Sequence, residues 1–158
     1  MSAKKPSVLF VCLGNICRSP SAEAVFKKKA FDSGINIEID SAGTLGYHKG
    51  VAPDKRSQTV GMSRGYSFNG LKCRKVVIQD FEKFDYILGM DNQNIAVLLE
   101  ACPEEFQQKV SLLLSFCVSR EQEVPDPYYG GILGFEYVLD LIEQGVDGFI
   151  EHLKSTGK

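Results

Sequence analysis

Residues 7–20 read SVLFVCLGNICRSP, and this stretch decides the fold class. Its first part, residues 7–11, is short, apolar and partly β-branched, which indicates a buried strand. A loop containing glycine follows. Pro20 suits the first turn of a helix that we expect to run to residue 33, with Ser19 as its cap. A strand that passes through a tight loop into a helix is typical of α/β proteins.

The rest of the chain continues this alternation of strands and helices. Further strands are expected at residues 35–40, 84–88 and 110–114, helices at 54–64 and after Asp91, and a final helix whose apolar residues recur every three or four positions. Residues 44–54 are rich in glycine and read as a long loop. Such alternation predicts βαβ units and a parallel sheet, whose functional sites lie beyond the carboxyl ends of its strands.

Length and composition limit the class of protein. The chain has 158 residues, 18 basic and 20 acidic, so we expect one domain over residues 1–158, with residues 1–6 flexible, and no nucleic-acid partner. No apolar run approaches the roughly 18 residues that span a bilayer, so no membrane association is expected. The odd number of scattered cysteines and the lack of a secretory signal favour free thiols and a cytoplasmic location. No metal site is expected, because the chain has no Cys-x-x-Cys and its two histidines lie far from the first cysteine pair.

The loop after the first strand carries the chemistry. Five residues separate Cys12 from Arg18; they are Leu13, Gly14, Asn15, Ile16 and Cys17. A tight loop that enters a helix points its backbone N–H groups inward and forms an anion site, and the arginine fork matches two oxygens of a phosphate. The same field stabilises a thiolate, so Cys12 is predicted to be a nucleophile that attacks phosphorus, without any metal or cofactor.

A second candidate segment is PDPYYGG at residues 125–131. Its two prolines stiffen it, Asp126 is its only carboxylate, and Tyr128 and Tyr129 offer an aromatic wall. Asp126 would protonate the leaving oxygen and then activate water against the phosphocysteine. The two tyrosines are also candidates for phosphorylation, because they lie beside an acidic residue.

Four blocks together resemble the low-molecular-weight protein tyrosine phosphatases: VCLGNICRSP at 11–20, DSAGT at 40–44, FDYILGMD at 84–91 and DPYY at 126–129. The resemblance implies a three-layer α/β/α fold, with a four-stranded parallel sheet and a phosphate-binding loop after the first strand. It implies phosphotyrosine hydrolysis, with Cys12 as nucleophile, Arg18 as phosphate clamp and Asp126 as general acid. Phosphotyrosine proteins would be substrates, phosphate-like oxyanions inhibitors, and the protein a monomer with acid phosphatase activity.

The resemblance also assigns supporting residues. Asn15 and Ser41 would hold the shape of the loop, Ser19 would give a hydrogen bond that favours the Cys12 thiolate, and Asp91 would give structural support. Cys17 would form a reversible disulfide with Cys12. The substrate cleft would be lined by Leu13, Ile16, Tyr47, Tyr128 and Tyr129.

Two positions depart from the family pattern. Tyr47 stands where many members have tryptophan, which makes the wall of the cleft smaller and more polar. Leu71 stands where many members have a histidine that steadies the loop through Asn15. One support of the loop is therefore expected to be missing.

Other functions on a similar fold remain open at this point. An arsenate reductase needs a later cysteine pair and has no use for Asp126, and a bacterial arginine phosphatase is associated with threonine where Ile16 stands. A phosphocysteine carrier would keep the loop without Asp126. In a phosphate-binding or redox-sensing module, Cys12 and Cys17 would be the functional pair.

Overall fold

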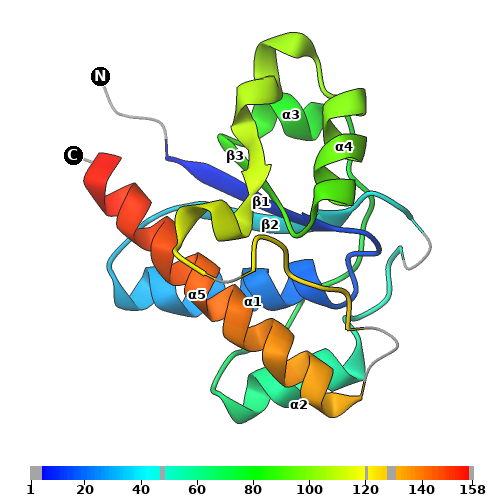
Figure 1. Ribbon diagram of the computed structural model, residues 1–158, viewed down its shortest axis with the longest axis vertical. Helices are drawn as coiled ribbons and strands as arrows, with labels where there is room; N and C mark the ends of the chain where they lie inside the picture. The colour runs from blue at the N-terminus through cyan, green and yellow to red at the C-terminus, as the bar shows by residue number, and fades with distance from the viewer. Residues whose placement is uncertain (1–4, 47–48, 120, 128–130, 157–158) are drawn as a thin grey trace.

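The computed structural model describes residues 5–46, 49–119, 121–127 and 131–156. Its elements, with η for 3₁₀ helices, are β1 (Ser7–Cys12), α1 (Arg18–Asp32), β2 (Glu38–Gly43), α2 (Lys55–Ser63), α3 (Gln79–Lys83), β3 (Tyr86–Gly89), α4 (Asn92–Ala101), η1 (Glu104–Lys109), β4 (Val110–Leu112), η2 (Leu113–Phe116) and α5 (Ile132–Thr156). The four strands form one parallel sheet in the order β2-β1-β3-β4 (Figure 1). The predicted α/β class and four-stranded parallel sheet are confirmed.

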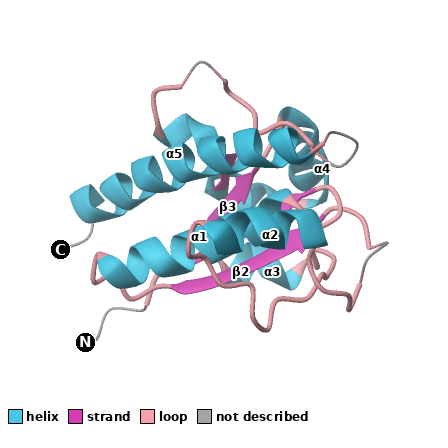
Figure 2. Cartoon of the chain, turned by 90° about the horizontal axis from the view of Figure 1, so that it is seen from below, coloured by secondary structure: helices cyan, strands magenta, loops and turns pink. Residues whose placement is uncertain are grey.

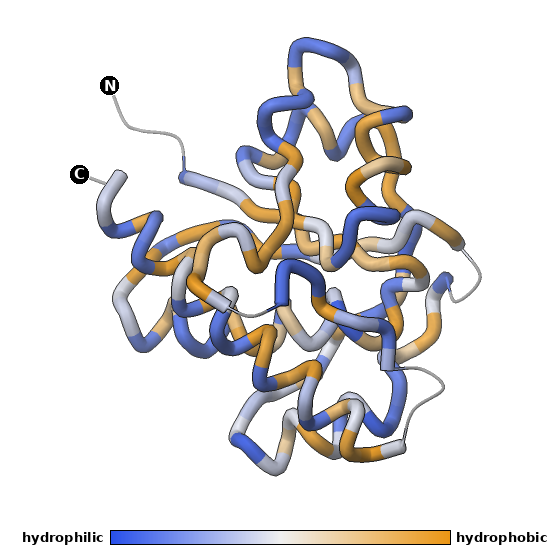
Figure 3. Tube along the Cα trace, viewed as in Figure 1, coloured by the Kyte–Doolittle hydropathy of each residue, from blue (hydrophilic) through white to orange (hydrophobic). Residues whose placement is uncertain are grey.

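Helices cover both faces of the sheet. Side chains alternate along β1, so Val8 and Phe10 join the apolar core under α1 and α5, while Leu9 and Val11 join a second core under α3 and α4. Figure 2 shows α1, α2 and α5 in front of the strands, and Figure 3 shows the hydrophobic colour of the strands near the centre of the molecule. Burial on both faces explains why β1 is continuously apolar after Ser7 rather than alternating.

The start of α1 and the position of β2 differ from the prediction. The helix begins at Arg18, and Ser19 lies inside its first turn, so the prediction of Ser19 as the cap is wrong. The strand expected at 35–40 runs instead from Glu38 to Gly43. Hydrogen bonding to β1 decides this: the ladder pairs Ser7 with Glu38 and continues to the end of β1. Local alternation in the sequence cannot show where a partner strand begins.

The C-terminal half also contains elements that the pattern did not predict. The short helix α3 and the 3₁₀ helix η1 were not expected, and the expected strand at 110–114 ends at Leu112, where η2 begins. Gly148 of α5 allows close packing on η2: a Cβ there would lie 2.1 Å from the carbonyl oxygen of Phe116. The glycine is therefore needed by tertiary packing.

Within the described ranges, none of the helices is both long and apolar enough to cross a membrane. All the described strands belong to one sheet, and all the long helices pack on it. Four of the six N-terminal residues that we expected to be flexible lie outside the described part of the chain.

Candidate active site

The site lies where β1 leads into α1, at the carboxyl end of an inner strand of the sheet. Cys12 is the last residue of β1 and is 2% exposed. Cys17 occupies the N-cap position of α1, and its side chain makes no capping hydrogen bond. The first amides of a helix that lacks such a cap attract anions. The junction between β1 and α1 therefore combines the buried Cys12 thiol with a helix start that attracts anions.

Ser19 approaches the Cys12 sulfur from the first turn of α1. Its Oγ lies 3.1 Å from Cys12 Sγ, and its backbone N–H donates to the same sulfur at 3.4 Å. Both groups favour negative charge on the sulfur, because each can point a proton at it. This role explains why the serine hydroxyl does not cap the helix.

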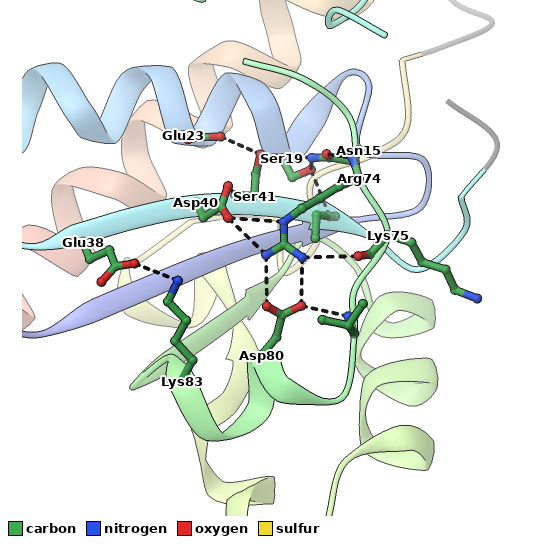
Figure 4. Close-up of polar contacts among 12 residues, drawn as sticks. Asn15, Ser19, Glu23, Glu38, Asp40, Ser41, Arg74, Lys75, Asp80 and Lys83 are labelled. Carbon is green, nitrogen blue, oxygen red and sulfur yellow. Dashed lines mark hydrogen bonds and ion pairs between the residues drawn. The ribbon is translucent and has the colours of Figure 1, made fainter. Parts of the chain in front are cut away.

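Asn15 holds the middle of the loop. It is fully buried and adopts φ 55°, the only positive φ among the described residues other than glycine. Its Nδ2 donates to Ser19 Oγ at 2.8 Å and to Ser41 Oγ at 3.0 Å, and its Oδ1 accepts the backbone N–H of Arg74 at 2.8 Å (Figure 4). Three hydrogen bonds to three different segments thus hold Asn15 in a backbone conformation that residues other than glycine rarely adopt.

The end of β2 lies directly against the loop. A Cβ on Gly43 would lie 2.8 Å from the carbonyl oxygen of Leu13 and 2.9 Å from the amide nitrogen of Asn15. The next amide, that of Thr44, donates to the carbonyl oxygen of Cys12 at 3.0 Å. Only glycine lets β2 approach the loop so closely.

Arg18 is buried, with 2% exposure, and is held along one edge. Its Nη1 donates to Asp91 Oδ2 at 2.7 Å and to the carbonyl oxygen of Val124 at 2.9 Å, while Nη2 lies 3.8 Å from Asp126 Oδ2. Burial acts to lower the pKa of Arg18, but charge on Cys12 and the two carboxylates outweigh it and raise this pKa. The guanidinium therefore remains charged and fixed in direction.

Asp91 has two functions in the structure. Its Oδ2 holds Arg18, and its Oδ1 accepts the amide of Asn94, which makes Asp91 the predicted cap of α4. In turn, the Asp91 amide donates to Asn94 Oδ1, which completes a capping box. The start of α4 is thereby linked to the start of α1.

The structure brings most of the predicted site residues together. They form two sets: hydrogen bonds join Cys12, Asn15, Ser19 and Ser41, and Arg18 contacts Asp91 and Asp126. The charge on Cys12 acts on Arg18 and so relates the two sets. Gly14 lies in the loop, Leu13 is 41% exposed and Ile16 is partly buried. Tyr47, Tyr128 and Tyr129 lie outside the described residues, so the cleft wall that they would form stays a prediction.

Cys17 is buried beneath the loop rather than facing outward. Burial, followed by the negative charge of Asp54, raises the pKa of the Cys17 thiol to about 12. Asp54 is anchored there as the cap of α2, and its amide donates to the carbonyl oxygen of Ile16 at 2.8 Å. Cys17 is therefore a protonated thiol near neutral pH.

The segment after Leu71 replaces the support expected from a histidine. Leu71 packs against the apolar core, and the loop is instead supported by the Arg74 amide that binds Asn15. The Arg74 side chain is fixed by two hydrogen bonds of 3.0 Å to Asp80 and by one of 3.2 Å to Asp40 (Figure 4). A main-chain donor thus does what the side chain at position 71 cannot do.

Sequence reasoning missed Glu23, Arg74 and the carbonyl oxygen of Val124. Glu23 had a readable signal: it lies on α1 four residues after Ser19, hence on the same side of the helix, among apolar neighbours. A buried acidic residue there needs a partner, and Ser41 Oγ donates to its Oε1 at 2.6 Å. The two backbone groups had no signal, because only tertiary contacts reveal them.

The sequence of this chain matches a known protein family over nearly its whole length. The family model described as "Low molecular weight phosphotyrosine protein phosphatase" matches residues 7–158. This chain belongs to that family. The resemblance drawn from the four sequence blocks is confirmed, and the loop between β1 and α1 lies within the matched range.

Two relatives are similar to this chain over nearly its whole length. The low molecular weight protein-tyrosine-phosphatase YfkJ of Bacillus subtilis is 41% identical over 94% of this chain and 96% of its own length. The crystal structure of a protein tyrosine phosphatase from Entamoeba histolytica, with Hepes in its active site, has a TM-score of 0.92 and 47% identity over 96% of this chain and 98% of that chain.

A third relative within the same fold has a different name. The crystal structure of a Drosophila arginine phosphatase has a TM-score of 0.87 and 35% identity, over 94% of this chain and 98% of that chain. The fold is therefore shared by phosphatases whose names refer to different phosphorylated residues.

Proposed function

We propose that this protein hydrolyses phosphotyrosine in proteins, and small aryl phosphates, through a phosphocysteine intermediate on Cys12. The observation that carries the proposal is the buried, charged Arg18, which Asp91 and Val124 hold beside the buried Cys12. Asp126 Oδ2 lies 3.8 Å from the other terminal nitrogen of Arg18, Nη2. Family membership supports the same reaction.

In the first step, the Cys12 thiolate attacks phosphorus and forms the S–P bond while the bond from phosphorus to the tyrosine oxygen breaks. Asp126 gives its proton to the departing oxygen. The three equatorial oxygens face the loop amides and Arg18, which stabilise the charge that develops on them. The fixed direction of the guanidinium means that little reorganisation is needed when the substrate arrives.

In the second step, Asp126 takes a proton from water, and the oxygen of that water attacks phosphorus as the S–P bond breaks. Inorganic phosphate leaves and the Cys12 thiolate is restored. Asp126 suits both steps, because the carboxylate left when it gives up its proton in the first step is the group that accepts the proton of water in the second.

Arginine phosphatase activity is the second candidate, because the Drosophila arginine phosphatase shares the fold at 35% identity. Ile16 favours the aromatic substrate, since a branched apolar side chain suits a tyrosine ring better than a guanidinium. Arsenate reduction is less favoured, since the later cysteines Cys73, Cys102 and Cys117 are all unpaired thiols far apart in the sequence. A phosphocysteine carrier would not need Asp126 beside Arg18.

The remaining properties belong to the same proposal. Phosphate and similar oxyanions would inhibit by occupying the loop, and the sulfonate of Hepes in the active site of the Entamoeba relative is an anion of this kind. Peroxide would convert Cys12 to a sulfenic acid, which the Cys17 sulfur would attack as its thiol loses its proton; a disulfide forms, and that proton leaves with the hydroxide of the sulfenic acid as water. We also propose acid phosphatase activity, a monomeric state and a cytoplasmic location.

A steady-state assay tests the proposal. Peptides that carry phosphotyrosine, phosphoserine or phosphoarginine are compared in the presence of EDTA. We expect turnover of phosphotyrosine well above the other two and no loss with EDTA. Preferred turnover of phosphoarginine would replace the proposal with the second candidate, and a single phosphorylation of Cys12 without turnover would indicate a carrier.

A further inference from the structure

Glu23 is a buried charge that the reaction steps above do not use. It lies in α1 with 5% exposure, and its Oε1 accepts the hydroxyl proton of Ser41 at 2.6 Å. Its Oε2 lies 3.4 Å from Lys27 Nζ, one turn along the helix. Figure 4 shows Glu23 at the outer end of a row of polar side chains that passes through Ser41 to Asn15 and Ser19.

The direction of each hydrogen bond in this row can be worked out from one fixed donor. The backbone N–H of Arg74 can only donate, so the Asn15 atom that faces it is the oxygen Oδ1. The amide group Nδ2 therefore faces the two hydroxyls, and Ser19 and Ser41 both accept from it. Each serine then has one proton left to donate.

The two remaining protons go to the two ends of the row. Ser41 donates to Glu23, because a carboxylate can only accept. Ser19 has Cys12 Sγ at 3.1 Å and the more distant carbonyl oxygen of Ala42 at 3.4 Å. With Glu23 ionised, every donor in the row has an acceptor, and the proton nearest the active site points at sulfur.

We propose that Glu23 is a positioning residue for the reaction: its carboxylate fixes the Ser41 hydroxyl, which fixes the amide of Asn15. The loop then keeps its left-handed residue, and Ser19 keeps its proton directed at Cys12. The inference rests on the proposed function, although the hydrogen-bond row exists without it. The effect is one of orientation, because an acceptor at one end of the row fixes the direction in which the donors along it point.

The pKa of Glu23 is raised overall, and Ser41 and Lys27 are the neighbours that support the ionised carboxylate that this role requires. Burial raises the pKa of Glu23, and the nearby charge of Asp40 acts in the same direction, whereas the hydrogen bond from Ser41 and the charge of Lys27 lower it. Leu71 increases the importance of this support, because it contributes no hydrogen bond of its own to the row.

A double-mutant cycle tests whether Glu23 acts through Ser41. The variants Glu23→Ala, Ser41→Ala and the double variant are assayed for kcat/KM with phosphotyrosine. We expect each single change to lower kcat/KM about tenfold, mostly in kcat, and the double variant to be no worse than Ser41→Ala alone. Losses that multiply in the double variant would show that Glu23 acts independently of Ser41 and would overturn the proposal.

A conservative variant and a distant one separate positioning from folding. Glu23→Gln keeps a carbonyl oxygen that can accept from Ser41, so its kcat/KM should stay within about threefold of the wild type; a loss as large as that of Glu23→Ala would contradict the proposal. Glu143→Gln is the matched control, because Glu143 binds Arg64 and Tyr66 at the end of α2 and, within the described part of the chain, makes no hydrogen bond or ion pair with the row. It should lower thermal stability without changing kcat/KM.

A readout without substrate distinguishes failure of this inference from failure of the proposed function. Iodoacetate alkylates Cys12 in the resting protein, and mass spectrometry measures its rate at neutral pH. We expect Glu23→Ala to slow alkylation about tenfold, whatever the enzyme's substrate is, because the Ser19 proton is no longer held toward sulfur. An unchanged rate would overturn the inference. If Glu23→Ala does not fold, Glu23→Met fills the same space without an acceptor and takes its place in both experiments.

Discussion

The loop at residues 12–19 and the segment at residues 124–127 meet at Arg18 but are built in opposite ways. In the loop, Asn15, Arg18 and Ser19 are almost completely buried and are held by hydrogen bonds from several elements. In the segment, Val124 is buried and anchored by its amide to the carbonyl oxygen of Met90. Two residues later, the Asp126 side chain is 44% exposed.

This difference shows how the two halves of the chemistry depend on the fold. Binding an oxyanion and holding a thiolate need donors fixed in advance, which requires a loop that is part of the core. Supplying a proton needs access to solvent and one well-placed carboxylate. Substitutions in the loop should therefore affect both stability and activity, whereas substitutions near Asp126 should affect activity alone.

The largest expected effect is that of Cys12→Ser. The hydroxyl is a far weaker nucleophile than the thiolate, so turnover of aryl phosphates should fall by more than about 10⁴-fold. The loop amides and Arg18 remain, so inorganic phosphate should still bind, which isothermal titration calorimetry measures. Activity retained above a trace would remove Cys12 from the role of nucleophile.

The next effect tests the exposed segment. Asp126→Ala should lower kcat with phosphotyrosine by about 10²- to 10⁴-fold, because the leaving oxygen loses its proton donor. The loss should shrink with aryl phosphates whose phenols are more acidic, and the melting temperature should not fall. An unchanged kcat, with slow hydrolysis of the phosphoenzyme excluded by burst kinetics, would assign the proton to another group.

The same substitution next to each region, at Gly43 beside the loop and at Gly131 after the segment, sharpens the comparison. Gly43→Ala places a Cβ 2.8 Å from the carbonyl oxygen of Leu13, so we expect a stability loss of about 1–3 kcal/mol and weaker phosphate binding. Gly131→Ala is the control, since no heavy atom lies within 4 Å of the new Cβ, and it should stay within about 0.5 kcal/mol of the wild type. Denaturant unfolding measures both, and equal losses would mean that the loop is no more tightly packed than the exposed segment.

The smallest expected effect concerns the buried thiol of the loop. Burial and then Asp54 raise the pKa of Cys17 to about 12, so below that pH its thiolate fraction, and the rate of disulfide formation, should rise as the pH rises. Asp54→Asn removes the negative charge and lowers this pKa, while asparagine still caps α2. After peroxide treatment, the disulfide between Cys12 and Cys17 should form about threefold faster at a given pH, as followed by mass spectrometry. A slower or equal rate would argue against Cys17 as the attacking thiol.

The sequence predicted elements well where a local signal marks them. The helices expected at residues 54–64 and after Asp91 are present as α2 and α4, and Asp54 and Asp91 cap them, because capping depends on residues only a few positions apart. The limits of β2, by contrast, depend on pairing with β1, and the 3₁₀ turn at Leu113 depends on packing against α5. Such contacts join residues far apart in the chain, and no local pattern encodes them.

The candidate site divides along the same line. By itself the sequence indicated the residues proposed as nucleophile, phosphate clamp and proton donor, since Cys12, Arg18 and Asp126 lie in short motifs whose residue types and order suit phosphoryl transfer. Tertiary structure alone decided what holds them: Glu23 behind Ser41, the Arg74 amide on Asn15 and the Val124 carbonyl oxygen on Arg18. The reason is physical, because chemistry needs particular side chains, whereas support needs only a donor or acceptor at the right place, and a backbone group from any segment can provide it.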